Sequence, residues 1–327
     1  MPETVSLKVY IFKRVLQMIP TFFIATFIIF ILIHSAPGDP LLYLAGDFEM
    51  PPAMRESLIK QYALDQPIFV QLAVFWKNII TGNLGYSIYF RAPVLDIIAQ
   101  RIPATLLLVI SSLVFSTIVG LILGIISARK PNSISDFVTS TVSLTGYSLP
   151  SFVVGMLLIL IFSVWLGWLP ASGMSSLRQN LTGFDQVVDV LSHLVLPVVS
   201  LGLVNVAVIS RLTRAKMREV FEEDYITLAR AKGLSEKSII LKHALRNASI
   251  PAITQIGLGI GFTFAGAVVT ETVFGWPGLG RLMYTALFAR DYPTLMGLFS
   301  IITIMVLIST LITDLTYRLV DPRIKLE

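Results

Sequence analysis

Residues 224–247 of this chain read DYITLARAKGLSEKSIILKHALRN, a charged stretch rich in helix-forming residues. Apolar segments flank it near residues 190–210 and 251–270. Each is about the 20 residues that a helix needs to cross the hydrocarbon core of a bilayer. The stretch therefore predicts a water-exposed island that joins two membrane-spanning helices.

Further apolar segments extend this pattern along the 327-residue chain. Hydrophobic residues make up 55% of the sequence and charged residues 14%, which is typical of a lipid-embedded protein. The mean hydropathy of +0.79 agrees with this class. The predicted spans lie near residues 15–36, 104–128, 137–166, 190–210, 251–270 and 294–317. We therefore expect an all-α integral membrane protein with six spans, the third of which is long enough to tilt or to continue outside the bilayer.

The first span follows three basic residues, as the apolar core of a secretory signal peptide would. Its apolar run is too long for such a peptide. The sequence after it, Ser35–Pro40, contains no convincing small-x-small cleavage site. We expect this span to be retained in the mature protein.

The distribution of lysine and arginine predicts the orientation of the spans. If the N-terminus, the 128–136 loop, the 211–250 loop and the C-terminal tail share one side, that side carries 17 of the 25 basic residues. Because short cytoplasmic loops are enriched in Lys and Arg, we expect both termini to be cytoplasmic. The sequence pI of 9.4 then reflects membrane topology, and we expect no nucleic-acid partner.

The predicted spans lack the groups that other classes of transporter need. Their apolar cores contain no Asp, Glu, Lys or Arg, which argues against a carrier driven by protons or sodium ions. Glu271 and Asp314 fall near span ends, where we expect solvated or helix-capping carboxylates. No Gly-Lys pair occurs, so the sequence has no P-loop, and any ATP must be bound by a partner.

The sequence also lacks the patterns of an enzyme or of a metal site. With no cysteine and three scattered histidines, we expect no disulfide, no thiolate nucleophile and no bound metal. Ser87 and Ser148 each follow a Gly-Tyr pair, but neither has the glycine two residues later that a nucleophile elbow requires. We expect no catalytic residue in this chain.

Within the island, local signals predict two helices joined by a tight turn. Residues 219–232 contain acidic side chains in the early turns and basic ones in the last, which suits the helix dipole. Gly233 can end this helix in a left-handed conformation, and Ser235 can cap the next helix.

The surface of this helical pair has two possible uses. Ala229 and Ala231 are small enough to let another protein approach the backbone closely. Ile239, Ile240 and Leu245 could fill a partner's pocket or pack back on the bundle. Taken alone, the segment is an amphipathic surface element, and its residue pattern leaves a specific docking role open.

The island resembles the EAA motif of ABC-importer permeases, the loop that docks into the ATP-binding subunit. Thr227-Leu-Ala229, three residues and then Gly233 occupy the positions of Glu-Ala-Ala-x-x-x-Gly. Asp224-Tyr-Ile and His243-Ala-Leu-Arg-Asn-Ala248 resemble the dipeptide, oligopeptide and nickel branch in particular. Thr227 replaces the usual glutamate, and His243-x-x-Arg246 replaces Ile-x-Leu-Pro, but that branch typically shows both departures.

Other segments carry the resemblance across almost the whole chain. They are similar, in order, to segments of the B-type permease subunit of that branch: Lys13–Leu16, Ile19–Phe22, Ala36–Pro40, Gly82–Ser87, Ser148–Phe152, Leu169–Gly173, Glu271–Gly280 and Tyr317–Arg323. The resemblance implies a type I ABC importer permease with six transmembrane helices, cytoplasmic coupling helices and an external segment after the first helix.

This resemblance also implies a division of the chain. Residues 1–100 would form the first helix and the external segment, where we expect short helices on the outer face. Residues 101–318 would form the permease core, with its coupling loop at about 211–250. Residues 319–327 would be a cytoplasmic tail. In the fifth span, Gly257-x-x-x-Gly261 permits close helix packing.

The implied function is that of a non-catalytic permease subunit in an ATP-driven importer of the inner membrane. Its partners would be a second permease subunit, one or two ATPase subunits, an extracytoplasmic substrate-binding protein and membrane lipid. ATP and Mg²⁺ would be bound by the ATPases, and this chain would bind no cofactor. Di- or oligopeptides are the expected cargo, with oligosaccharides, nickel and glutathione-like molecules as alternatives. A passive channel or a membrane scaffold would explain the spans but not the ordered motifs.

Seven residues of the island are predicted to form or support the ATPase-docking site. They are Asp224, Thr227, Ala229, Ala231, Gly233, His243 and Arg246, the last of which would orient the second helix. No substrate-path residue is predicted, because a lining that must release its cargo has little chemical signature.

Overall fold

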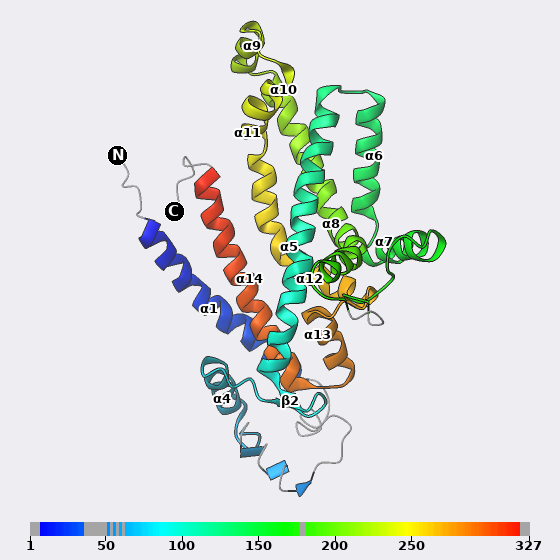
Figure 1. Ribbon diagram of the computed structural model, residues 1–327. Helices are drawn as coiled ribbons and strands as arrows, with labels where there is room; N and C mark the ends of the chain where they lie inside the picture. The colour runs from blue at the N-terminus through cyan, green and yellow to red at the C-terminus, as the bar shows by residue number, and fades with distance from the viewer. Residues whose placement is uncertain are drawn as a thin grey trace. The chain divides into compact units, whose positions relative to one another are not determined.

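The computed structural model describes residues 7–35, 51–52, 55–56, 59–60, 63–176 and 181–320. As expected, helices dominate these residues (Figure 1). The chain divides into two compact units. Unit 1 comprises residues 1–105 and 277–311, and unit 2 comprises residues 106–276 and 312–327. Two long helices, α5 (Val94–Arg129) and α14 (Tyr292–Val320), contribute to both units.

Helices occupy all six predicted spans. Four of them are individually long and apolar enough to cross a membrane, namely α1 (Leu7–His34), α5, α8 (Phe184–Phe221) and α14. A bent pair in the third predicted segment can be counted as a fifth span. The fifth predicted segment is α12 (Ile250–Val273), a helix of 24 residues.

The third segment differs from the single tilted or extended helix that its length predicted. Helix α6 (Ile134–Ser148) ends at Leu149, and α7 (Ser151–Leu158) continues into the π-helix η1 (Ile159–Trp165). The chain bends by 109° between the two halves. Pro150 explains the break, because its ring pushes the preceding residue out of the helical region and Leu149 is extended, with φ −88° and ψ 134°.

In unit 1, a short helix and a hairpin follow the first span. Helix α4 (Ile68–Ile80) lies within the predicted external segment, most of whose earlier part falls outside the described residues. It packs on α1, where the indole N–H of Trp76 donates to Thr26 Oγ1 at 3.1 Å. Strands β1 (Tyr86–Ser87) and β2 (Ala92–Pro93) pair antiparallel.

The core of unit 1 lies where the start of α5 meets α13 (Leu279–Phe288) and α14. Val94, Ile98 and Leu298 are completely buried there. Asp291, between α13 and α14, accepts hydrogen bonds from the hydroxyls of Ser87 at 2.5 Å and Thr294 at 2.6 Å. The hairpin is thereby tied to the start of the last span.

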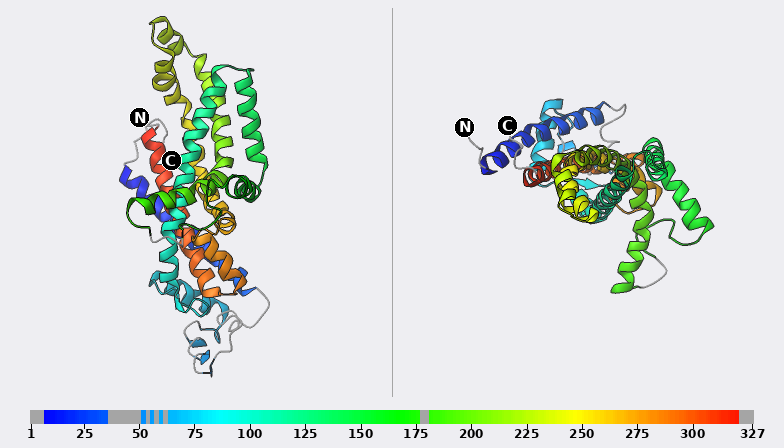
Figure 2. Two further views of the ribbon diagram at one scale, coloured as in Figure 1. Left: turned by 45° about the vertical axis from the view of Figure 1, so that its right-hand side comes forward. Right: turned by 90° about the horizontal axis from the view of Figure 1, so that it is seen from above.

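In unit 2, α8 is the central helix, and α6, α7 and α12 all pack against it (Figure 2). Its contact with α5 is unusually close. A Cβ atom added to Gly120 would lie 2.7 Å from Ile209, and one added to Gly124 would lie 2.6 Å from Thr213. Glycines spaced four residues apart therefore let these two backbones approach, as in other membrane helix pairs.

Candidate partner-docking site

The predicted island folds as two helices at the end of α8 (Figure 1). The first is α9 (Asp224–Ala231). The second is continuous and comprises α10 (Glu236–Ser238), the π-helix η2 (Ile239–Ala244) and α11 (Leu245–Ala248). The predicted pattern of helix, tight turn and helix is therefore present.

The start of the first helix was predicted too early, at residue 219. Helix α8 continues to Phe221, and α9 begins only at Asp224, after an extended Glu223. The reason is packing, because Met217 and Val220 continue the buried stripe of α8 into the same apolar cluster that receives α9. Tertiary packing, and not the local charge pattern, therefore determines where α8 ends and α9 begins.

The turn between the two helices has the predicted chemistry. Gly233 has φ +75°, a conformation that favours glycine. Its N–H donates to Arg230 O at 2.9 Å, and the N–H of Leu234 donates to Ala229 O at 3.3 Å, which together form a Schellman cap. The Ser235 hydroxyl accepts the N–H of Ser238 at 3.4 Å and caps the second helix.

An apolar cluster fixes this helical pair to the bundle. Ile226 and Ile239 are fully buried, and Ile240 and Ala229 are each 6% exposed. They pack with Met217 and Val220 of α8 and with Ala128 of α5. Of the two uses predicted for the isoleucines, the structure shows the second, packing on the bundle. Ala229, predicted to face a partner, lies in the same cluster.

The opposite face of α9 is open to the surroundings. Asp224, Thr227, Leu228 and Ala231 are all exposed and recur at the i, i+3, i+4, i+7 spacing of one helical face. Leu228, which is 55% exposed, was not among the predicted site residues. The same spacing applied to Asp224 would have found it.

Polar contacts hold the two helices together. The Tyr225 hydroxyl accepts a hydrogen bond from Asn247 Nδ2 at 3.0 Å, and Arg230 Nε lies 3.2 Å from Glu236 Oε1. His243 is half-buried within η2, and Arg246 is exposed. Arg246 adjoins the Asn247 contact, and its orienting role stays a prediction.

The outward face of α9 and the turn at Gly233 are together called the α9 face below. It combines a carboxylate, a threonine hydroxyl, an exposed leucine and a small alanine on a helix whose other side is anchored. Within the described ranges, no group of three or more His, Cys, Asp or Glu side chains is placed to hold a metal ion.

Comparison with known families agrees with this geometry. Residues 120–326 match the family described as the binding-protein-dependent transport system inner membrane component. Residues 7–109 match the N-terminal region of the same membrane components. The chain belongs to this family. It is a multi-pass inner-membrane permease subunit of an ABC importer, as the EAA-like residues indicated.

Characterised relatives of this permease cover nearly its full length. It is 40% identical to a di/tripeptide transport system permease protein DppB of Pseudomonas aeruginosa over 97% of this chain and 98% of the relative. Identity is also 40% with a glutathione transport system permease protein GsiC of Escherichia coli K12, and 39% with the dipeptide transport system permease protein DppB of the same strain. Each of these matches covers 97% of this chain and 98% of the relative.

A solved structure supports the type I importer permease fold. The permease resembles a chain of the inward-facing MetNI methionine ABC transporter with a TM-score of 0.55. The similarity covers 69% of this chain and 97% of the other, at 17% sequence identity. At this identity, the comparison concerns the fold alone.

Proposed function

We propose that this permease carries di- or oligopeptides into the cell. The support comes from three relatives, at 39–40% identity over 97% of the chain, whose cargoes are dipeptides, di- and tripeptides, and glutathione. Glutathione is itself a tripeptide, so a short peptide is the chemistry that these relatives share. Glutathione-like cargo is the alternative within this class.

In this proposal, the chain pairs with a second permease subunit, and the α9 face docks one ATPase on the cytoplasmic side, where both termini also lie. The ATPases bind ATP and Mg²⁺, and an external binding protein delivers the peptide. This chain supplies no catalytic group. The observation that carries the docking role is a helix anchored by buried Ile226 on one side and exposing Leu228 on the other.

The proposed mechanism is alternating access. A ligand can shift a conformational equilibrium only through a difference in its affinity for the two states. ATP has that difference because it brings the two ATPases together, and α9 transmits their movement through the buried cluster to α8. The spans then open outward to receive peptide, and hydrolysis restores the inward-facing state.

Replacing Gly233 by valine tests the docking role. Valine at φ +75° is strained by roughly 1–2 kcal/mol, so we expect the turn and the α9 face to shift. The expected result is at least a tenfold loss of peptide uptake, with ATPase activity no longer stimulated by the binding protein. Gly82 is the matched control, because it also has φ +75° and open space around its Cβ position, but lies in unit 1.

Quantitative immunoblotting of membranes separates loss of docking from loss of insertion. Both valine variants should insert at wild-type levels, and Gly82→Val should retain ATPase subunits on purification. Normal uptake by inserted Gly233→Val would contradict the docking assignment. Uptake of labelled dipeptide, competed by unlabelled tripeptide or glutathione, tests the cargo independently.

A further inference from the structure

A pocket that includes arginine and serine side chains lies among α5, α6 and α8 in unit 2. Its volume is about 250 Å³, and it is partly open to the surroundings. Two arginines of α8, Arg211 and Arg214, line it, as do Ser140, Ser143 and Tyr147 of α6. On each helix these residues are three or four positions apart and therefore share one face. The pocket does not include the α9 face.

Two hydrogen-bond donors in this pocket have no partner among the described residues. They are the hydroxyl of Ser143 and the Nε–H of Arg214, both on fully buried atoms. Leaving such a donor unsatisfied is destabilising, and more so when the group is charged. Two unsatisfied donors lining one pocket indicate a missing acceptor.

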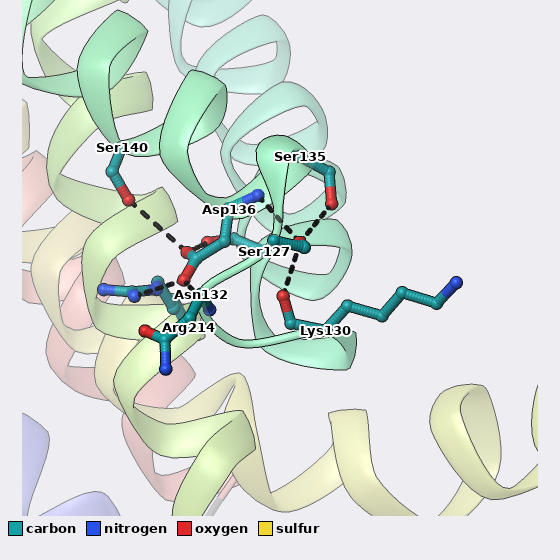
Figure 3. A network of polar contacts seen from close by, with 8 residues as sticks. Ser127, Lys130, Asn132, Ser135, Asp136, Ser140 and Arg214 are labelled. Atoms are coloured by element: carbon teal, nitrogen blue, oxygen red, sulfur yellow. Dashed lines mark hydrogen bonds and ion pairs between the residues drawn. The ribbon is translucent and has the colours of Figure 1, made fainter.

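The charge of the pocket points to an anion. Arg214 is balanced by the buried carboxylate of Asp136, with Nη2 and Oδ2 2.7 Å apart (Figure 3). Asp136 also accepts bonds from the Ser127 hydroxyl and from the Asn132 N–H. Arg211 has no such carboxylate among its described contacts and lies 5.9 Å from the centre of the Tyr147 ring. Arg211 therefore leaves the pocket with an excess positive charge.

The rim of the pocket is apolar and exposed. Leu144 is 67% exposed and Tyr147 is 55% exposed, and both line the pocket. The exposed apolar face of α6 continues at Phe137 and Val138, which are 72% and 51% exposed. A ligand with a charged head and apolar chains would match this combination.

We propose that this pocket binds the phosphate group of an anionic phospholipid. The phosphate oxygens pair with Arg211 and, once the Ser143 and Arg214 side chains turn toward the pocket, accept from the Ser143 hydroxyl and from Arg214 Nε–H. The acyl chains lie along α6. Basic pockets between membrane helices are known to suit anionic headgroups, whose oxygens accept several hydrogen bonds. The proposal concerns lipid and does not depend on the identity of the transported cargo.

Lipid retention tests this proposal. The complex isolated through a tag on this chain is placed in nanodiscs of phosphatidylcholine with or without phosphatidylglycerol, and mass spectrometry counts the retained lipid. We expect the wild type to retain phosphatidylglycerol selectively. Arg211→Gln and Ser143→Ala should each weaken this binding about tenfold, the effect of one charge-assisted hydrogen bond.

Two matched controls accompany these variants. Arg218→Gln removes an exposed arginine of the same helix outside the pocket. Ser163→Ala removes another buried hydroxyl that lacks a partner, in η1 and away from the pocket lining. Both control variants should retain lipid as the wild type does. In lipid-free detergent, Ser143→Ala should not lower thermal stability, because no hydrogen bond is lost.

The proposal is overturned if phosphatidylglycerol and phosphatidylcholine are retained equally, or if Arg211→Gln behaves like Arg218→Gln. A titration with inorganic phosphate separates the two sources of the anion. Thermal stabilisation by free phosphate, without selective lipid retention, would overturn the lipid assignment and indicate a soluble phosphate compound.

Discussion

Two helix-to-helix turns in unit 2 are built alike but anchored differently. The turn between α9 and α10 contains Gly233 at φ +75° and a serine cap, Ser235. The turn between α5 and α6 contains Asn132 at φ +61° and a serine cap, Ser133. Buried apolar side chains anchor the first, whereas an ion pair at Asp136 anchors the second.

The difference shows how the type of anchor determines which side chains of a turn remain exposed. At the α9 turn, apolar residues face inward, so Asp224 and Thr227 remain available to a partner. At the α6 turn, the carboxylate of Asp136 is 3% exposed and is occupied by internal contacts. The ion pair of Asp136 and Arg214 therefore stabilises the α5–α6 turn, and Arg214 lines a pocket instead of an open surface.

The largest expected effect comes from breaking the polar anchor. Asp136→Leu leaves Arg214 without its carboxylate. Because the Arg214 side chain is 31% exposed, we expect a cost below the roughly 3–5 kcal/mol of a fully buried ion pair. We expect a lower thermal midpoint of the purified protein and faster hydrogen exchange in residues 129–140. The double variant Asp136→Leu/Arg214→Met should recover most of the stability. If the double variant is no more stable than the single one, the ion pair is not the anchor.

The next effect concerns the surface of the apolar-anchored turn. Leu228→Asp should reduce ATPase retention about tenfold, while the thermal midpoint stays unchanged because Leu228 is 55% exposed. Ile134→Asp is the matched control, since Ile134 is 83% exposed at the start of α6. If the two variants retain the ATPase equally on co-purification, the α9 turn is no more important for docking than the α6 turn.

The serine caps should give a smaller difference. Losing a cap costs about 1 kcal/mol. The Ser133 hydroxyl accepts from Asp136 N at 3.3 Å and donates to Lys130 O at 2.5 Å, whereas the described bond of Ser235 is a single one of 3.4 Å. We therefore expect Ser133→Ala to lower the thermal midpoint more than Ser235→Ala does. The reverse order would show that the α9 turn depends more on its cap.

The smallest expected effect is at the exposed ion pair of the α9 turn. Arg230 and Glu236 are 47% and 57% exposed, and such pairs contribute up to about 1 kcal/mol. Arg230→Gln should therefore change stability little, and any change should shrink as salt is raised. A loss as large as that of Asp136→Leu would show that this turn also relies on a polar anchor.

Much of this molecule could be predicted from its sequence because its signals are local. Apolar runs located the helices, and Gly233 and Ser235 predicted the α9 turn from backbone chemistry alone. Pro150 explains the bend at Leu149, but the sequence predicted one continuous span because the apolar run continues through the proline. Likewise, the motif at Gly120 and Gly124 has the same spacing as that noted at Gly257 and Gly261, yet only the structure shows its partner, α8.

Other features could not be predicted because they depend on residues far apart in the sequence. Asp136 and Arg214 are 78 positions apart, and nothing near either residue indicates the other. Glu271, expected to be solvated or capping near a span end, is instead fully buried. The burial of Ala229 likewise depends on how α9 meets α8. The seven docking residues stay predictions, with Asp224, Thr227 and Ala231 sharing the open face.

The length of α8 bears on the proposed docking role. Its 38 residues make a helix about 57 Å long, nearly twice the thickness of the hydrocarbon core. For such a helix, a tilt of only about 5° displaces one end by roughly 5 Å relative to the other. Met217 and Val220 pack α9 against this helix. In the proposed mechanism, a displacement of α9 by about one helical turn would therefore tilt α8 by a few degrees at membrane depth.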